Sequence, residues 1–243
     1  MDETQLLYSR LEDMICSSYY DGCSYMGFLN ERECALCASY LKNRGVDFTI
    51  FGGYKNATRV FFAVGDDAAA DFPIKALHIS SKGSKELTHR DYLGSLMGLG
   101  IKRECVGDII TLNEREAVVF VRDEISAHII RDLDKVGRDS IVIIEYKGDT
   151  DSLGSVTEEL SLIVTSMRAD NFVAACINSS RSEAVQLIAS DMVFINYTQV
   201  SKTSRTVSEG DVVSIRGYGK YIVGPLKSKT KRDRLVIKVF HYI

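Results

Sequence analysis

Residues 180–196 read SRSEAVQLIASDMVFIN, and this stretch decides the fold of the C-terminal third of the chain. Ser180, with Glu183 three residues later, forms a capping-box pattern and predicts that a helix begins there. Apolar side chains then recur with the spacing of one helix face, at Ala184, Val185, Leu187 and Ile188. The sequence from Met192 to Asn196 alternates as a strand does, and residues 211–216 predict a second strand.

A shorter helix is expected immediately before this one. It begins at Arg168 or Ala169 and ends near Ile177, with an apolar side at Phe172, Val173 and Cys176. The predicted order is therefore two adjoining helices followed by two short strands.

The start of the second helix has the chemistry of a phosphate site. Arg181 follows the N-cap, where backbone N–H groups lack helical acceptors, so the helix dipole and the cation act together on an anion. Lys202, Arg205 and Arg216 extend the same surface in this interpretation. The alternative is that Arg181 is only a solvated residue of the first turn.

Charge is distributed unevenly along the 243 residues. Residues 168–243 hold 12 Lys and Arg against 6 Asp and Glu, a net charge of +6, and residues 1–167 hold 18 against 27, a net charge of -9. A basic end on an acidic body indicates contact with a polyanion at that end, although a solvated basic face would have the same composition.

The C-terminal motifs resemble those of an S4 RNA-binding domain. The family pattern is Arg-Leu-Asp, a short helix, Ser-Arg-x-x-Ala-x-x-Leu-Ile, then Val-x-Val-Asn, a polar loop and Gly-Asp. This chain has RAD at 168–170, SRSEA at 180–184, LI at 187–188, VFIN at 193–196 and GD at 210–211. Asp191 stands where the family usually has glycine, at a position that needs left-handed backbone, which Asp tolerates at a cost.

Further motifs extend the resemblance to YlmH-type proteins, over nearly the whole chain. They are FGGY at 51–54, HRDYLG at 89–94, GLGIKRE at 98–104, GDI at 107–109, SIRGYGK at 214–220 and TKR at 230–232. The resemblance implies RNA binding through the S4 domain, a middle domain that also binds RNA, and association with the large ribosomal subunit. It further implies a role in rescue or quality control of stalled ribosomes, near peptidyl-tRNA. Some relatives are linked to cell division.

The residues expected to contact RNA surround the tip of the second helix. They are Arg168, Ser180, Arg181, Ser182, Asn196, Lys202, Arg205 and Arg216. A second patch of RNA contacts is expected at Arg90, Lys102 and Arg103. Structured RNA would be recognised mainly by its shape and by phosphate position. The expected partners are rRNA, with tRNA as a second ligand, and the large ribosomal subunit.

Three small domains of mixed helix and strand, an α+β fold, are predicted at residues 1–73, 74–150 and 165–243. The first has a helix around Leu6–Ile15, a second from Asn30 to Asn43, and strands at 47–51 and 58–64. Between these strands lies GGYKN at 52–56, whose glycines either make the turn or let the backbone approach a ligand. Residues 147–155 are polar and contain glycine, which is typical of a linker.

The second domain reads as β-α-β-β-α-β, the ferredoxin-like order that also underlies the RNA-recognition motif. Its strands are expected at 74–79, 108–112, 117–121 and 139–146, and its helices begin at Thr88 and near Ile125. RNA-recognition motifs stack bases on aromatic side chains of the two central strands. Only Phe120 is available in the third strand, so base stacking is weakly indicated.

Catalysis is not expected. His89-Arg90-Asp91 has the letters of a kinase catalytic loop but lacks the downstream Asn, and helix capping explains it better. An RNA-modifying enzyme would need a catalytic domain or a glycine-rich cofactor loop, and neither is found. Protein–protein adaptor activity remains an alternative, because the acidic body could face a basic ribosomal protein.

No cofactor or metal site is expected either. Cys34 and Cys37 form the only closely spaced cysteine pair and lie within a predicted helix, so buried thiols are the simplest interpretation. The chain is 45% hydrophobic and 26% charged, without an apolar run long enough to cross a membrane and without a basic N-terminal region. We therefore expect a cytoplasmic monomer with no membrane partner.

Overall fold

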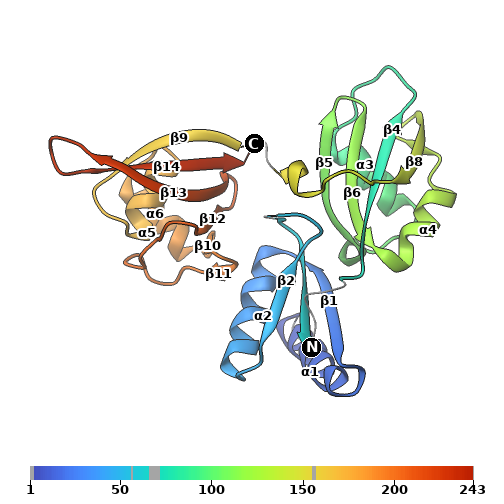
Figure 1. The fold of residues 1–243 in the computed structure, drawn as a ribbon, viewed down its shortest axis with the longest axis horizontal. Coiled ribbons are helices and arrows are strands. Elements are labelled where there is room, and N and C mark those ends of the chain that lie inside the picture. Colours follow the sequence, from blue (N-terminus) through green and yellow to red (C-terminus); the bar gives the residue numbers. More distant parts are fainter. Residues whose placement is uncertain (1–2, 56, 66–71, 155–156, 243) are drawn as a thin grey trace. The chain divides into compact units, whose positions relative to one another are not determined.

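The structure is a computed structural model that describes residues 3–55, 57–65, 72–154 and 157–242. The chain divides into two compact units: Met1–Glu33 with Tyr40–Gly154, and Ser155–Ile243 with the short stretch Cys34–Ser39. Both combine helices and strands, which confirms the α+β prediction (Figure 1). Within the described residues, no helix has the length and apolar character needed to cross a membrane.

The N-terminal part of the chain is a three-stranded antiparallel sheet with two helices. Its elements are α1 (Glu3–Asp21), β1 (Cys23–Leu29), α2 (Glu31–Asn43), β2 (Phe48–Phe51) and β3 (Val60–Gly65), with sheet order β1-β3-β2. The capping box before α2 is confirmed: Asn30 Oδ1 accepts the Glu33 N–H at 3.1 Å, and Glu33 Oε2 accepts the Asn30 N–H at 2.8 Å. Strand β1 was not predicted. Cys34 and Cys37 are buried, as expected.

The central part of the first unit has the predicted ferredoxin-like topology. Its elements are β4 (Ile74–Ser81), α3 (His89–Gly98), η1 (Arg103–Cys105), β5 (Val106–Asn113), β6 (Glu116–Arg122), α4 (Asp123–Asp132), β7 (Lys135–Val136), β8 (Asp139–Glu145) and η2 (Asp151–Gly154). The sheet order is β5-β6-β4-β8-β7, so the first and third strands of the motif are the central pair. The short strand β7 is an addition to the predicted pattern.

Helices α3 and α4 cover one face of this central sheet. Leu77 and Val119 point to that face and share a core with Tyr92, Leu96 and Ile129 of the helices. Because side chains alternate along a strand, Phe120 points to the other face, which we call the open face of the central sheet.

The loop between β2 and β3 docks on the open face. The Tyr54 ring stacks on Phe120 with 4.9 Å between centroids, and the Tyr54 hydroxyl donates to Asp108 Oδ2 at 2.9 Å. A Cβ atom at Gly53 would lie 2.3 Å from a carbon of the Phe120 ring, and Gly53 has a φ of +97°. Two roles were considered for these glycines, making the turn or letting the backbone approach a ligand. The backbone at Gly53 does make a close approach, but to the Phe120 side chain of the same unit rather than to a ligand.

The second unit contains a six-stranded antiparallel sheet, in the order β11-β10-β12-β13-β14-β9. Its elements are β9 (Thr157–Val164), α5 (Ala169–Cys176), α6 (Arg181–Ala189), β10 (Val193–Ile195), β11 (Thr198–Gln199), β12 (Val212–Ile215), β13 (Gly219–Lys229) and β14 (Leu235–Tyr242). Strand β9 pairs with β14 from Thr157 to Val164, so the sheet begins before the predicted start at residue 165. Within the predicted linker at 147–155 the structure has the short helix η2.

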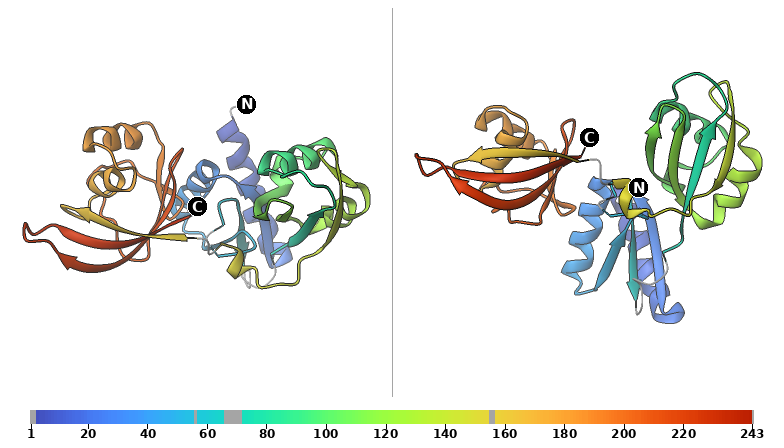
Figure 2. Two further views of the ribbon diagram at one scale, coloured as in Figure 1. Left: turned by 90° about the horizontal axis from the view of Figure 1, so that it is seen from above. Right: turned by 45° about the horizontal axis from the view of Figure 1, so that its top comes forward.

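Helices α5 and α6 lie together on one side of this sheet, as both views of Figure 2 show. Phe172 of α5 and Ile188 of α6 share a core with Val193, Ile195 and Ile215 of the strands. Ala184 and Ile188 face inward as predicted, whereas Val185 is 37% exposed and does not belong to that face. The helix-covered side of the sheet is thus fixed by alternate residues of its strands.

Candidate nucleic-acid interface

Asp170, the second residue of α5, organises the cations at the start of the two helices. It is only 1% exposed and receives both guanidinium groups. Arg168 donates through Nε at 3.2 Å and Nη2 at 2.9 Å, and Arg181 donates through Nε at 3.0 Å and Nη2 at 2.7 Å. These hydrogen bonds, first of all those from Arg168, outweigh the effect of burial and lower the pKa of Asp170 to about 2.

The carboxylate holds two cations without covering them. The side chains of Arg168 and Arg181 remain 39% and 59% exposed. A guanidinium has five N–H donors, and each of these two gives only part of them to Asp170, so the others can point to a ligand. The group of three residues, which we call the Asp170 cluster, keeps a net charge of +1 and presents two oriented forks.

The loop from Lys202 to Thr206 lies beside the same helix start. Ala169 donates its backbone N–H to Arg205 O at 2.8 Å, and Asp170 donates its own to Thr203 O at 3.2 Å. An isolated antiparallel bridge also joins Arg168 to Thr206. These bonds place Lys202, which is exposed, and Arg205, which is half-buried, next to the Asp170 cluster. Four of the predicted cations therefore come together.

Ser180 caps α6, but the capping box is incomplete. The Ser180 side chain accepts the Glu183 N–H at 3.1 Å, as predicted. Glu183 does not return the bond, because its carboxylate accepts the Ser179 hydroxyl and lies 3.4 Å from the Tyr218 hydroxyl. Ser180 and Ser182 are both exposed beside Arg181, so the predicted serines do lie at the helix tip.

Asn196 has a structural task that the sequence did not reveal. It adopts a φ of 48°, and its amide donates to Asp211 Oδ1 at 2.8 Å while its oxygen accepts the Val212 N–H at 2.9 Å. These bonds join the end of β10 to the start of β12, and they engage both the NH₂ group and the oxygen of the Asn196 side chain. Asp191 also has a left-handed φ of 58°, as its position in the motif predicted.

Arg216 lies apart from the helix tip. Val193 and Ile195 face the helices, so Phe194 between them faces the opposite side of the sheet. The Arg216 guanidinium lies over the Phe194 ring, 5.5 Å from its centroid. The prediction that Arg216 extends the Arg181 surface is therefore not supported by its position.

In the second predicted patch, Arg90, Lys102 and Arg103, one of the three cations has a structural role. Arg103 donates to the carbonyl oxygens of Val106 and Gly107. Burial, followed by the charge of Arg59, lowers the pKa of Arg103 to about 10. Arg90 and Lys102 are exposed, so only these two are placed for a ligand.

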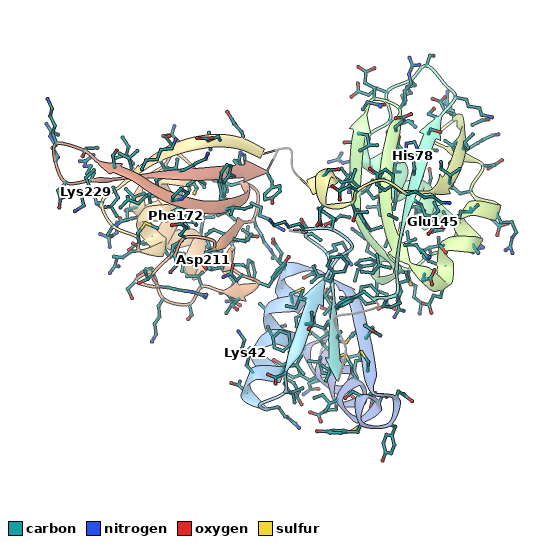
Figure 3. The ribbon with its side chains drawn as sticks, in the orientation of Figure 1. Lys42, His78, Glu145, Phe172, Asp211 and Lys229 are labelled. Atoms are coloured by element: carbon teal, nitrogen blue, oxygen red, sulfur yellow. The ribbon has the colours of Figure 1, made fainter. Side chains whose placement is uncertain are left out.

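A cationic hairpin was missed as a candidate site. The turn between β13 and β14 carries basic side chains on exposed backbone, and Lys229 lies near its end (Figure 3). Lys227 pairs with Glu159 at 2.9 Å and Lys229 with Asp233 at 2.9 Å. The signal was present in the sequence as KSKTKRDR at 227–234. Exposed cations on a two-stranded ribbon are suited to phosphate contacts.

Two family models match this chain. The model described as "Putative RNA-binding domain in YlmH" matches residues 68–149, and the model of the S4 domain matches residues 167–213. The first match covers the central sheet with its helices, and the second covers the Asp170 cluster and the loop beside it.

The chain is also similar to a curated protein and to a solved structure. The chain is 27% identical over 213 residues to "Ribosome-associated protein quality control protein P2" of Bacillus subtilis, covering 85% of this chain and 82% of that protein. The solved structure of "Cell division protein ylmH from Streptococcus pneumoniae" matches with a TM-score of 0.51 and 19% identity, over 60% of this chain and 92% of that one. The latter likeness concerns the fold alone. The chain thus matches the S4 domain and the YlmH-type RNA-binding domain over these residues, and it is similar to a ribosome-associated quality control protein.

Proposed function

We propose that this chain binds structured RNA of the large ribosomal subunit through its S4 domain, and acts there without catalysis in the rescue or quality control of stalled ribosomes. The observation that carries the proposal is the Asp170 cluster with the loop Lys202–Thr206 beside it. The name of the Bacillus subtilis relative supports the ribosomal context. In this proposal rRNA is the main ligand, tRNA a second one, and the protein acts as a cytoplasmic monomer.

The domain limits proposed for this activity are 1–73, 74–150 and a C-terminal domain from 165, to which β9 adds its strand. The RNA-binding surface is the tip formed by the starts of α5 and α6. A bidentate fork suits phosphate oxygens, and Asp170 holds two such forks in place before RNA arrives. Because these contacts go to the backbone, recognition depends on the spacing of phosphates rather than on base identity.

Salt dependence tests the charge of this surface. With about four phosphates neutralised, log affinity should fall against log salt with a slope of roughly -3 to -4. The measurement is co-sedimentation of the purified protein with large ribosomal subunits over a series of salt concentrations. An affinity that does not change with salt would contradict the proposed surface.

Substitutions test which cations carry the binding. Arg181→Ala leaves Asp170 paired with Arg168 and removes one fork, and Lys202→Glu reverses an exposed charge on the neighbouring loop. Both should weaken binding to the subunit at least several-fold, and Lys202→Glu more than a lost contact because repulsion is added. Arg131→Glu on α4 makes the same charge change at an exposed pair in the first unit and should bind as the parent does. Equal binding by all four proteins would refute the surface.

The acidic body favours a second candidate, a protein–protein adaptor. Residues 1–167 carry a net charge of -9 and could face a basic ribosomal protein. Ending the chain after Gly154 removes the whole six-stranded sheet and separates the two candidates. Loss of subunit binding supports the RNA-binding module, whereas retained binding supports the adaptor. Base modification in RNA incubated with the intact protein would instead indicate an enzyme.

A further inference from the structure

A pocket of about 500 Å³ lies within the first unit, between β2 of the N-terminal part and the open face of the central sheet. Aromatic side chains from both parts line it: Phe51, Phe72, Phe120 and Tyr146. Its size lies within the range of small-ligand sites. The aromatic lining gives it flat apolar walls.

The four aromatic rings of the pocket differ in how exposed they are. Phe120 is buried, because Tyr54 stacks on it and Gly53 lies against its edge. Phe51 remains 39% exposed, and its ring lies 5.4 Å from that of Phe72 at 55° between planes. The accessible rings are therefore those of Phe51, Phe72 and Tyr146, beside the position that Tyr54 occupies.

Tyr54 occupies the place on Phe120 where a base would stack in an RNA-recognition motif, so a base could stack only elsewhere on this face. In RNA-recognition motifs, aromatic side chains on the open sheet face stack on unpaired bases. Here the aromatic side chain of the third strand already stacks on Tyr54 of the same unit. The aromatic side chains left beside this stacked pair are those of the neighbouring pocket.

A charged pair lies on the other side of the strands that line the pocket. Lys75 Nζ lies 3.2 Å from Glu145 Oε1, and both side chains are substantially exposed; Figure 3 labels Glu145. Because Lys75 pairs with Val121 and Glu145 pairs with Leu77, both side chains leave the sheet on the helix-covered face. The pocket on the open face therefore offers a ligand its aromatic rings rather than this pair.

We propose that this pocket binds one unstacked nucleobase of RNA. The base lies against the rings of Phe51, Phe72 and Tyr146. The proposal rests on the proposed RNA-binding function and adds a base-binding site, separate from the phosphate-binding tip of the S4 domain. The site would engage a base splayed out of a loop or a single strand, since a paired base offers no free face.

The test uses guanosine 5′-monophosphate and ribose 5-phosphate with the full chain. Saturation-transfer NMR should show the strongest contact at the H8 proton of the guanine ring, and the ribose protons of ribose 5-phosphate should show no comparable contact. Equal saturation of the ribose protons in both compounds, without saturation of H8, would mean that only the ribose phosphate binds, and would overturn the proposal.

Variants locate the binding. Phe51→Ala removes a partly exposed ring and should weaken binding of guanosine 5′-monophosphate roughly tenfold, in line with the effect of removing one stacking partner. Phe51→Leu keeps apolar volume without the flat ring and should weaken it as well, which separates loss of stacking from loss of folding. Tyr19→Ala removes another exposed ring of the first unit and should change nothing. Unchanged affinity in both Phe51 variants would refute the site.

Two further substitutions complete the design. Glu145→Gln changes a side chain on the helix-covered face and should leave the affinity for guanosine 5′-monophosphate unchanged, and a several-fold loss would mean that the base lies elsewhere than on the open face. Arg181→Ala should leave nucleotide binding intact while weakening subunit binding. If the Phe51 variants bind nucleotide normally and Arg181→Ala still weakens subunit binding, the pocket proposal fails alone. If Arg181→Ala has no effect on subunit binding, the proposed function fails independently.

Discussion

Replacing Asp170 by Asn should destabilise the second unit, because it removes the charge that holds two guanidinium groups. The change keeps the shape of a side chain that is 1% exposed. It also places an amide NH₂, which is a donor, among the N–H groups of Arg168 and Arg181. The hydrogen bonds at 2.7–3.2 Å from these two residues cannot all be kept.

The size of the effect follows from the pKa of Asp170. Its lowering from 3.8 to about 2 corresponds to a stabilisation of about 2 kcal/mol at neutral pH, at 1.36 kcal/mol per pKa unit. Solvent around the two exposed arginines screens the interaction, so about 1–2 kcal/mol is the expected loss. For a unit of this size that loss lowers the Tm by roughly 4–16 °C.

The assay is calorimetric unfolding of the parent and Asp170→Asn proteins over a range of pH. A carboxyl group whose pKa is lower in the folded state stabilises the fold above its unfolded pKa. This stabilisation is lost as the pH falls through the folded value. The difference in Tm should therefore be constant above pH 5, shrink as the pH falls below about 4 and approach zero only below about pH 2. Equal Tm values at pH 7 would refute the reasoning, and so would a difference at pH 2 as large as that at pH 7.

Asp132 provides a matched control for this experiment. Hydrogen bonding to Arg131 also lowers its pKa to about 2, but the pair lies at the surface of α4. Surface ion pairs contribute little to stability because water and salt screen them. Asp132→Asn should therefore leave the Tm unchanged, which separates the effect of burial from the effect of a low pKa.

Three other experiments have defined outcomes. Gly53→Ala should destabilise the first unit in denaturant unfolding, because its Cβ would clash with the Phe120 ring at a φ of +97°, whereas Gly94→Ala, with open space in helix α3, should be neutral or stabilising. Replacing Lys229, Lys231 and Arg232 together by Ser should make the salt slope of subunit binding less steep by roughly 1 to 3, and an unchanged slope would exclude the hairpin from the interface. Asn196→Ala removes both bonds to the start of β12 and should lower the Tm without changing the salt slope, since its amide serves the fold.

Local chemistry explains which elements could be predicted from the sequence. The starts of α2 and α6 depend on side chains three residues apart, so Asn30 with Glu33 and Ser180 with Glu183 were sufficient to locate them. The ferredoxin-like order also follows from the alternation within each segment. Strand β9 could not be assigned in this way, because its partner β14 lies far along the chain and no local signal connects them.

In the candidate site, too, residue types could be predicted from the sequence, whereas positions that depend on distant segments could not. Arg168, Arg181, Lys202 and Arg205 were recognised by type and motif, and backbone bonds of the loop bring them together. The side of the sheet on which Arg216 lies depends on the register of β12 with β10, which the sequence does not state. The base-binding position of Phe120 was indicated weakly, and the structure gives the reason, because Tyr54 from a distant segment stacks there.

Asp170 should affect RNA binding in two opposite ways. Its negative charge reduces the attraction of the tip for phosphate, so the two arginines together count as fewer than two cations in a salt titration. Its hydrogen bonds also fix both forks before binding, which reduces the side-chain entropy that binding must otherwise cost. Asp170→Asn should therefore steepen the salt slope while weakening discrimination between folded rRNA and an unstructured strand. A variant that gained charge but kept full discrimination would show that the arginines need no positioning.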